Sequence, residues 1–145
     1  MNLCVFAYLH LFVSVCVVGE GEPLFNFRNV SRAIQVLTDP NACAFSKRKV
    51  TVSTSGVVNL IPRVVNDLGV ELAISLHATT NEMRDYLVPL NKTFPIEVLF
   101  DTLHSLRLKR EITFEYVMLD HVNDFLDDAK RLLDLTRGLP CSVNL

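Results

Sequence analysis

Short apolar runs alternate with longer amphipathic stretches along this chain. The apolar runs lie near residues 13–18, 49–53, 70–75, 111–118 and 141–145. A strand in a parallel sheet is covered on both faces, so it reads as a continuous apolar run rather than an alternating one. Strands that alternate with helices are joined by right-handed connections into a parallel sheet. The pattern therefore predicts an α/β fold with five parallel strands and helices between them.

The intervening stretches carry helix signals, including a short helix from Asn81 that Pro89 ends and a helix from Pro95 to about Leu106. Asn26 or Asn29 is placed to cap a helix that runs to about Leu37. A second helix is expected over residues 57–68, with Pro62 in its first turn and Gly69 as its C-cap. A helix over residues 125–136 is expected to turn four apolar side chains inward: Leu126, Ala129, Leu132 and Leu133.

The chain divides into an apolar extension, residues 1–12, and one domain over residues 13–145. Residues 3–18 can be read as a signal peptide or short membrane segment, or as a buried strand preceded by an extension. We favour the strand, because no Lys or Arg precedes the run and the polar string GEGEP follows it at once.

Composition indicates a globular domain. Half of the 145 residues are hydrophobic and 21% are charged, which argues against disorder. The net charge of −2 predicts no extended basic surface for nucleic acid. Cys4, Cys16, Cys43 and Cys141 have neither the spacing of a zinc site nor that of an iron–sulfur loop. We expect reduced thiols in an intracellular protein, with Cys16 and Cys141 buried and Cys43 exposed.

Polar strings follow the first three predicted strands: GEGEP at 19–23, STSGVV at 53–58 and SLHATT at 75–80. Residues just past the carboxyl ends of parallel strands share one rim of the sheet, where ligands bind. A glycine there lets the backbone approach a ligand, and a carboxylate can pair with an ammonium group. We therefore expect five residues to face one pocket for a small molecule: Gly21, Glu22, Ser53, Ser75 and His77.

These strings, with NFRNVSRAIQVLTDP, TFEYVMLDHVND and LPCSVNL, resemble the radical S-adenosylmethionine enzymes that methylate carbon 2 of an adenine in 23S rRNA and tRNA. The resemblance runs from about Val15 to Leu145, and its blocks keep the family's order, which makes it specific. It implies a partial (β/α) barrel of the radical S-adenosylmethionine type, with strands two to six of six present. Strand one is then missing, which is expected to leave the parallel edge near Val13 to Val18 unpaired. The chain is then a fragment that corresponds to the middle of the family protein.

The resemblance also implies cofactors and partners. The family uses S-adenosylmethionine and a [4Fe–4S] cluster, acts on 23S rRNA and tRNA, and has no membrane partner. The implied cofactor-binding residues here are Gly21, Glu22, Ser53, Ser75, Leu76 and His77. The cluster cysteines and the methyl-carrying cysteine have no counterpart, so we expect this chain alone not to methylate RNA. The main RNA-binding surface is expected in segments that it lacks. The location is expected to be cytoplasmic, or an organelle such as a chloroplast.

Other residues and other functions stay open. Glu115 alternates with apolar residues and fits either a pocket role or a structural ion pair. Asp120, Asn123 and Asp124 are read as a turn and helix cap rather than a metal loop. Residues 47–49 are read as a solvated charge run rather than an RNA contact. The alternatives to the methyltransferase are a non-catalytic protein that keeps the fold and an unrelated βα enzyme for a phosphorylated metabolite.

Overall fold

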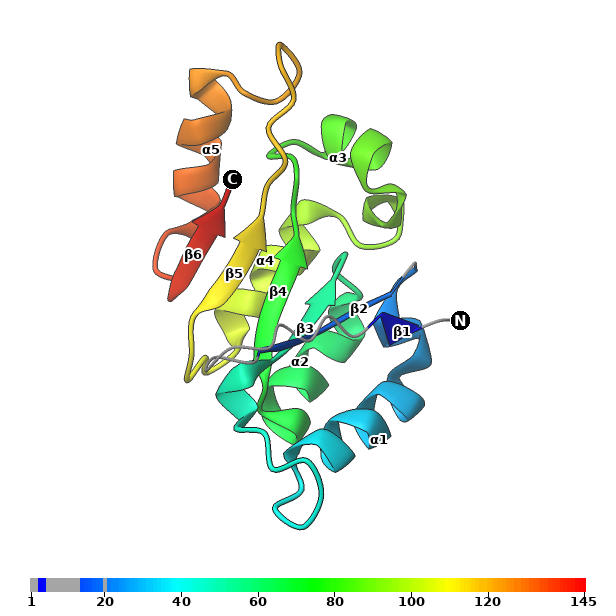
Figure 1. The fold of residues 1–145 in the computed structure, drawn as a ribbon. Helices are drawn as coiled ribbons and strands as arrows, with labels where there is room; N and C mark the ends of the chain where they lie inside the picture. The colour runs from blue at the N-terminus through cyan, green and yellow to red at the C-terminus, as the bar shows by residue number, and fades with distance from the viewer. Residues whose placement is uncertain (1–2, 5–13, 20) are drawn as a thin grey trace. The chain divides into compact units, whose positions relative to one another are not determined.

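The structure is a computed structural model that describes residues 3–4, 14–19 and 21–145. Its strands are β1 (Leu3–Cys4), β2 (Val15–Gly19), β3 (Val50–Thr54), β4 (Glu71–Ser75), β5 (Ile112–Glu115) and β6 (Cys141–Asn144). They follow one another in the sheet in chain order (Figure 1). Strand β2 pairs with β3, and β5 with β6, in parallel. The predicted α/β fold with five parallel strands is confirmed, while the curvature of a partial barrel stays a prediction.

Strand β1 belongs to the extension that the sequence left without a role. Its Leu3 pairs with Gly19 and its Cys4 with Val18, antiparallel to β2. The prediction of an unpaired outer edge is therefore wrong at Val18 and Gly19. A strand of two residues is too short to produce a periodic signal in the sequence. The rest of residues 1–12 lies outside the described residues.

The helical segments fall between the strands, as predicted. They are η1 (Pro23–Asn26), α1 (Phe27–Thr38), η2 (Lys47–Lys49), η3 (Val58–Leu60), α2 (Ile61–Arg63), η4 (Val64–Leu68), α3 (Asn81–Leu87), η5 (Pro89–Lys92), α4 (Ile96–Ser105) and α5 (Leu126–Thr136). Pro62 lies in the first turn of α2, and Gly69 ends η4 with φ 63°, a left-handed C-cap. Both predictions are confirmed, although η4 is a π-helical turn. Such turns leave no separate mark in the hydrophobic pattern.

The cap of the first helical segment differs from the prediction. Asn26 precedes α1, but its side chain makes no capping hydrogen bond to the backbone and instead accepts one from the amide of Asn29 (2.9 Å). The carboxylate of Glu22 caps η1 by accepting from the backbone N–H of Leu24 (3.0 Å). The chain thus enters its helix one short 3₁₀ turn earlier than the predicted caps implied.

The chain forms two compact units. Unit 1 comprises residues 1–54 and 59–73, as far as they are described, and unit 2 comprises residues 55–58 and 74–145. The core of unit 1 is aliphatic, with Val50, Val52, Ile61 and Val64 fully buried. The core of unit 2 is built around α4 and β5: it includes Leu76, Leu99, Leu103 and the stacked rings of Phe100 and Phe114, whose centroids are 5.4 Å apart.

Helix α5 does not turn its apolar stripe inward. The exposed fractions of Leu126 and Leu133 are 72% and 70%, and no residue of α5 is fully buried. Ala129 is also exposed, and Leu132 is half-buried. The prediction is wrong for Leu126 and Leu133, whereas Ala129 and Leu132 line a pocket of unit 2 together with Tyr116. Polar contacts of Asp128 and Arg131 with Thr79 help to orient the helix in this way. None of the described helices is long and apolar enough to cross a membrane.

The exposed stripe of α5 yields a test of this orientation. Replacing Leu126 and Leu133 together by Lys should change the free energy of unfolding by no more than about 0.5 kcal/mol, as for ordinary surface substitutions. The same change should reduce aggregation, because it removes exposed apolar area. Denaturant unfolding and light scattering measure the two effects. Leu103→Lys, in the buried core, is the matched control and should unfold the chain. A loss above about 2 kcal/mol in the double variant would contradict the exposed orientation.

Candidate functional site

The first part of the predicted site lies at the carboxyl ends of β2 and β3 in unit 1. Gly21 and Glu22 follow β2, and Ser53 is the fourth residue of β3. These strands are parallel neighbours, so unit 1 brings the three residues to one rim. Ser53 is half-buried between the buried Val52 and Thr54, as expected from alternation along a strand.

Two of the interactions that hold Glu22 are hydrogen bonds to one carboxylate oxygen. Its Oε1 accepts from the backbone N–H of Leu24 (3.0 Å) and from the hydroxyl of Thr54 (2.8 Å). The carboxylate is therefore fixed against the end of β3 before any ligand arrives. Thr54 is a site residue that the sequence did not reveal, because a threonine at the end of a strand is unremarkable in composition.

Gly21 lies beside open space. A Cβ built at this residue would meet no atom of the described residues within 4 Å. The glycine is therefore not required by packing inside the described protein. Its absence of a side chain leaves room for a bound molecule at the rim.

The second part of the predicted site lies in unit 2. Ser75 ends β4 and is half-buried, whereas Leu76 is fully buried. The backbone N–H of Leu76 donates to the carbonyl of Glu115 (3.0 Å), and its carbonyl accepts from Arg84. Both backbone polar groups of Leu76 are thus occupied. The carboxylate of Glu115 accepts from the amide of Asn144 (2.9 Å), a partner that neither earlier reading of Glu115 named.

His77 adopts a backbone conformation that is rare outside glycine. Its φ is 56°, and strained residues of this kind gather at functional sites. Its Nδ1 accepts from the backbone N–H of Val117 (3.1 Å), so the neutral ring carries its proton on Nε2. Burial, and then the positive charge of Arg84, lower the pKa of His77, while Glu115 partly offsets them. His77 is therefore a neutral hydrogen-bond donor at neutral pH.

Asn123 holds the loop that faces His77. It is buried, and its Nδ2 donates to the carbonyls of His77 (2.7 Å) and Val117 (2.8 Å). Its Oδ1 accepts from the backbone N–H of Leu119, and its own carbonyl accepts from the Tyr116 hydroxyl. Burial is the main cause that raises the pKa of Tyr116 to about 12, so this hydroxyl remains a donor. Asn123 therefore stabilises the loop between β5 and α5 through its hydrogen bonds, and it is not the predicted cap of α5.

Arg84 is the largest fully buried side chain of the described protein. Its guanidinium donates to the carbonyls of Ser55 (2.7 Å), Ser75 (3.1 Å) and Leu76 (3.1 Å). Its Nη1 also donates to Asn91 Oδ1 (3.0 Å). Arg84 therefore ties the end of β4 to the loop after β3, both within unit 2. No pattern in the sequence indicated this role, because arginine in a short helix is normally a surface residue.

The neutral amide of Asn91 connects the guanidinium of Arg84 to the carboxylate of Asp85. Asn91, also buried, donates from Nδ2 to the carboxylate of Asp85 (2.6 Å) and to Asn81 Oδ1 (3.0 Å). Burial lowers the pKa of Arg84 to about 10, and Asp85 acts against that shift. The guanidinium therefore stays protonated at neutral pH and keeps its donors.

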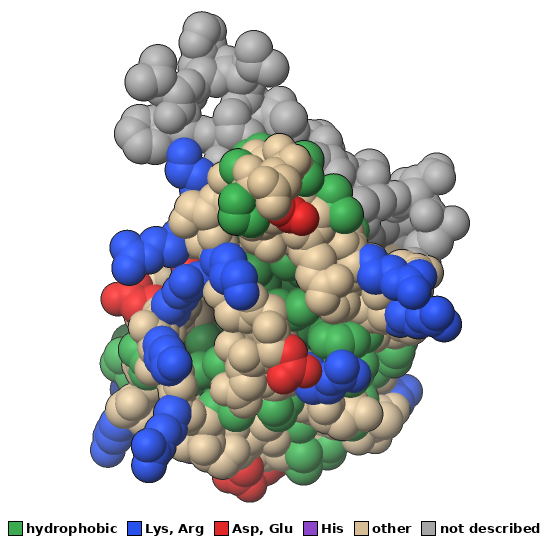
Figure 2. Space-filling model, turned by 90° about the horizontal axis from the view of Figure 1, so that it is seen from below, with side chains coloured by type: hydrophobic (Ala, Val, Ile, Leu, Met, Phe, Trp, Pro, Cys, Tyr) green, Lys and Arg blue, Asp and Glu red, His purple; other side chains and the backbone are tan. Residues whose placement is uncertain are grey.

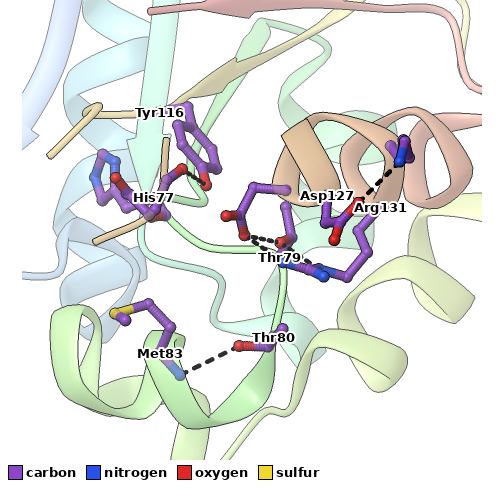
Figure 3. Close-up of polar contacts among 10 residues, drawn as sticks. His77, Thr79, Thr80, Met83, Tyr116, Asp127 and Arg131 are labelled. Carbon is purple, nitrogen blue, oxygen red and sulfur yellow. Dashed lines mark hydrogen bonds and ion pairs between the residues drawn. The ribbon is translucent and has the colours of Figure 1, made fainter. Parts of the chain in front are cut away.

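A second polar cluster fastens α5 to the loop after β4. The hydroxyl of Thr79 donates to Asp128 Oδ1 (2.7 Å) and accepts from Arg131 Nε (3.0 Å). Figure 3 shows Arg131 reaching from α5 to Thr79, near His77 and Tyr116. Burial works to raise the pKa of Asp128, but hydrogen bonds from Thr79 and Arg131 outweigh it and lower that pKa. This cluster sets the position of α5 relative to the His77 loop.

The described residues do not fit a metal cluster. They contain no group of three His, Cys, Asp or Glu side chains that could hold a metal ion. Cys16 is in β2, Cys43 in the turn after α1 and Cys141 in β6, so these thiols lie on separate elements. Cys43 is exposed as predicted, whereas Cys16 and Cys141 are half-buried rather than buried. Burial raises the pKa of Cys141, which makes its thiol less reactive.

Removing the Arg84 guanidinium tests how much it contributes to the free energy of unfolding. Arg84→Met should lower the free energy of unfolding by about 3–5 kcal/mol, because it leaves three carbonyls and Asn91 without a donor. Arg84→Lys keeps the charge but reaches fewer acceptors, so its loss should be smaller. Denaturant unfolding measures both, and the lysine variant covers the case in which the methionine variant does not fold. Arg137→Met, at an exposed arginine, is the matched control. Equal stability of the Arg84→Met and Arg137→Met variants would contradict this role.

The lowered pKa of His77 predicts a loss of stability in mild acid. The unfolded chain binds a proton at the ordinary pKa of about 6.5, whereas the folded chain binds it only at lower pH. Stability should therefore fall as pH drops from 7 through this window and level off below the folded pKa. His77→Asn tolerates the positive φ and should flatten this dependence. His104→Asn is the control and should keep it. Identical pH profiles for the two variants, measured by denaturant unfolding, would refute the assignment.

No family model matches the chain, but comparisons with curated proteins and solved structures find relatives. The chain is 48% identical over 135 residues to dual-specificity RNA methyltransferase RlmN of Bartonella henselae, and equally so to that of Chelativorans sp.. Each match covers 91% of this chain and 33% of the relative. The chain thus spans about a third of the length of these curated relatives.

A solved structure supports the same assignment. A radical SAM methyltransferase from Sphaerobacter thermophilus superposes with a TM-score of 0.85 and 40% sequence identity. The superposition covers 91% of this chain and 40% of that chain. Sequence identity and shared fold at this level lead to one conclusion: the chain belongs to the RlmN family of radical SAM methyltransferases and corresponds to part of their length.

Proposed function

We propose that this chain binds S-adenosylmethionine as part of a methyltransferase that acts on carbon 2 of adenine in 23S rRNA and tRNA. The observation that carries the proposal is the fixed carboxylate of Glu22 beside the open space at Gly21. The names of the relatives, RNA methyltransferases, support the reaction class. The cytoplasm, or an organelle such as a chloroplast, is the location that fits such a substrate.

The residues of the two units offer the groups that this cofactor needs. The Glu22 carboxylate is suited to its ammonium group, because Oε1 is already anchored by Thr54 and Leu24. Ser53 and Ser75 are half-buried hydroxyls that can donate to its oxygens, and His77 offers a neutral Nε2–H. Leu76 is fully buried with both backbone polar groups occupied, so its share is to hold Ser75 and His77 in place. S-Adenosylmethionine supplies the methyl group, and the protein's share is to bind and orient it.

The [4Fe–4S] cluster of the family does not fit the described residues. A cluster needs closely spaced thiolates, whereas Cys16, Cys43 and Cys141 lie on separate elements. We therefore derive no step through it from this chain. Binding of the cofactor, rather than its cleavage, is the activity that we assign to these residues.

Titration calorimetry with S-adenosylmethionine tests the proposal. Glu22→Gln keeps an acceptor for Leu24 and Thr54 but loses the charge, so affinity should fall about tenfold or more with the fold intact. Gly21→Val should abolish binding by filling the open space. Ser53→Ala should weaken binding moderately, and Ser105→Ala, at an exposed serine at the end of α4, is the matched control.

Two results would overturn the assignment. In the first, Glu22→Gln binds as tightly as the unchanged chain, which removes the ammonium pairing. In the second, ribose 5-phosphate binds more tightly than S-adenosylmethionine, which favours an unrelated βα enzyme for a phosphorylated metabolite. Thermal unfolding of each variant separates loss of binding from loss of fold.

A further inference from the structure

A groove in unit 1 is lined mainly by basic and polar side chains. Its volume is about 460 Å³, and its lining comes from α1 and from the end of α2: Phe27, Arg28, Ser31, Arg32, Gln35 and Arg63. We call it the arginine groove. On the face that Figure 2 shows, Lys and Arg side chains are more prominent than Asp and Glu side chains.

The arginines of α1 form a stripe without compensating acids. Arg28 and Arg32 are four residues apart and therefore lie on one face of the helix, with Ser31 and Gln35 beside them. Helix α1 contains no Asp or Glu, and both arginines are exposed. Neither has an ion-pair partner among the described residues. Like charges at this spacing destabilise a helix, so the stripe carries a cost that an anionic ligand would remove.

Arg63 faces this stripe in a preorganised position. Its guanidinium carbon lies 4.3 Å from the centroid of the Phe27 ring, and its Nε donates to Asp67 Oδ2 (3.1 Å). These two contacts use Nε and one face of the guanidinium, which leaves the Nη groups for a ligand. Asp67 offsets part of the charge of Arg63 but orients its planar donors.

We propose that the arginine groove binds the phosphodiester backbone of single-stranded RNA. Guanidinium groups bind phosphate through paired hydrogen bonds, and arginines one helical turn apart can engage successive phosphates. Ser31 and Gln35 add neutral donors for phosphate or ribose oxygens. The choice of RNA over another polyanion rests on the proposed function, whereas the preference for phosphate rests on the groove itself. This basic surface lies within the chain, where a net charge of −2 predicted none.

Fluorescence anisotropy with a labelled single-stranded oligoribonucleotide tests the groove in the full chain. The triple variant Arg28→Gln, Arg32→Gln and Arg63→Gln should bind at least about tenfold more weakly, and the slope of log K against log salt should become shallower by about 2. The matched control removes the same charge from exposed positions of unit 2: Arg107→Gln, Lys109→Gln and Lys130→Gln. It should keep affinity within about twofold. Arg63→Lys keeps the charge but loses the planar fork, so its affinity should be intermediate.

Three outcomes would overturn the proposal. The two triple variants could weaken binding equally, which would indicate a general charge effect. The unchanged chain could fail to bind the oligoribonucleotide. A poly-glutamate peptide could compete as well as unlabelled RNA, which would indicate an acidic protein partner instead. Calorimetry with S-adenosylmethionine on the same samples keeps the two proposals apart, because the arginine-groove variant should bind the cofactor like the unchanged chain.

Discussion

The buried guanidinium of Arg84 is the interaction on which the rim of unit 2 depends. Moving a cation out of water is costly, and here that cost is offset by hydrogen bonds to Ser55, Ser75, Leu76 and Asn91. These carbonyls lie at the end of β4 and at the start of the loop after β3. The Arg84 side chain therefore holds both backbone segments in position. Any ligand bound at Ser75 or His77 therefore meets backbone that Arg84 has already fixed, which lowers the ordering that binding requires.

The later part of unit 2 is attached by polar contacts more than by apolar packing. Thr79, Asp128 and Arg131 join α5 to the loop after β4, and Asn123 joins the loop before α5 to His77. Hydrogen bonds are directional, so they fix an orientation even where little apolar area is buried. This explains how α5 keeps a defined position while Leu126 and Leu133 face solvent. It also links the strained His77 backbone to a loop that is distant in sequence.

The hydrophobic pattern predicted the elements of this fold, and its limits have physical causes. Apolar runs located five parallel strands, and Pro62 and Gly69 marked the ends of a helical stretch. Each of these signals depends on residues that are close together in the chain, so it can be recognised in a single sequence. The contacts of Arg84, Asn123 and Thr54 join distant parts of the chain, and composition assigns such residues to the surface. The predicted orientation of α5 was wrong for a similar reason, because amphipathic spacing marks an apolar face of a helix without showing that another element covers it.

The net charge of the whole chain does not describe the charge of its individual segments. Residues 111–134 contain seven acidic and two basic side chains, whereas α1 contains two arginines and no acid. The net charge of −2 averages these and all other segments over the whole chain. In solution the field of an exposed charge decays over about 8 Å at physiological ionic strength. A phosphate at the arginine groove therefore responds mainly to Arg28, Arg32 and Arg63, with Asp67 the opposing charge that directly contacts one of them. The local distribution of charged side chains, and not the net charge of the chain, decides whether a weakly acidic protein can bind a polyanion.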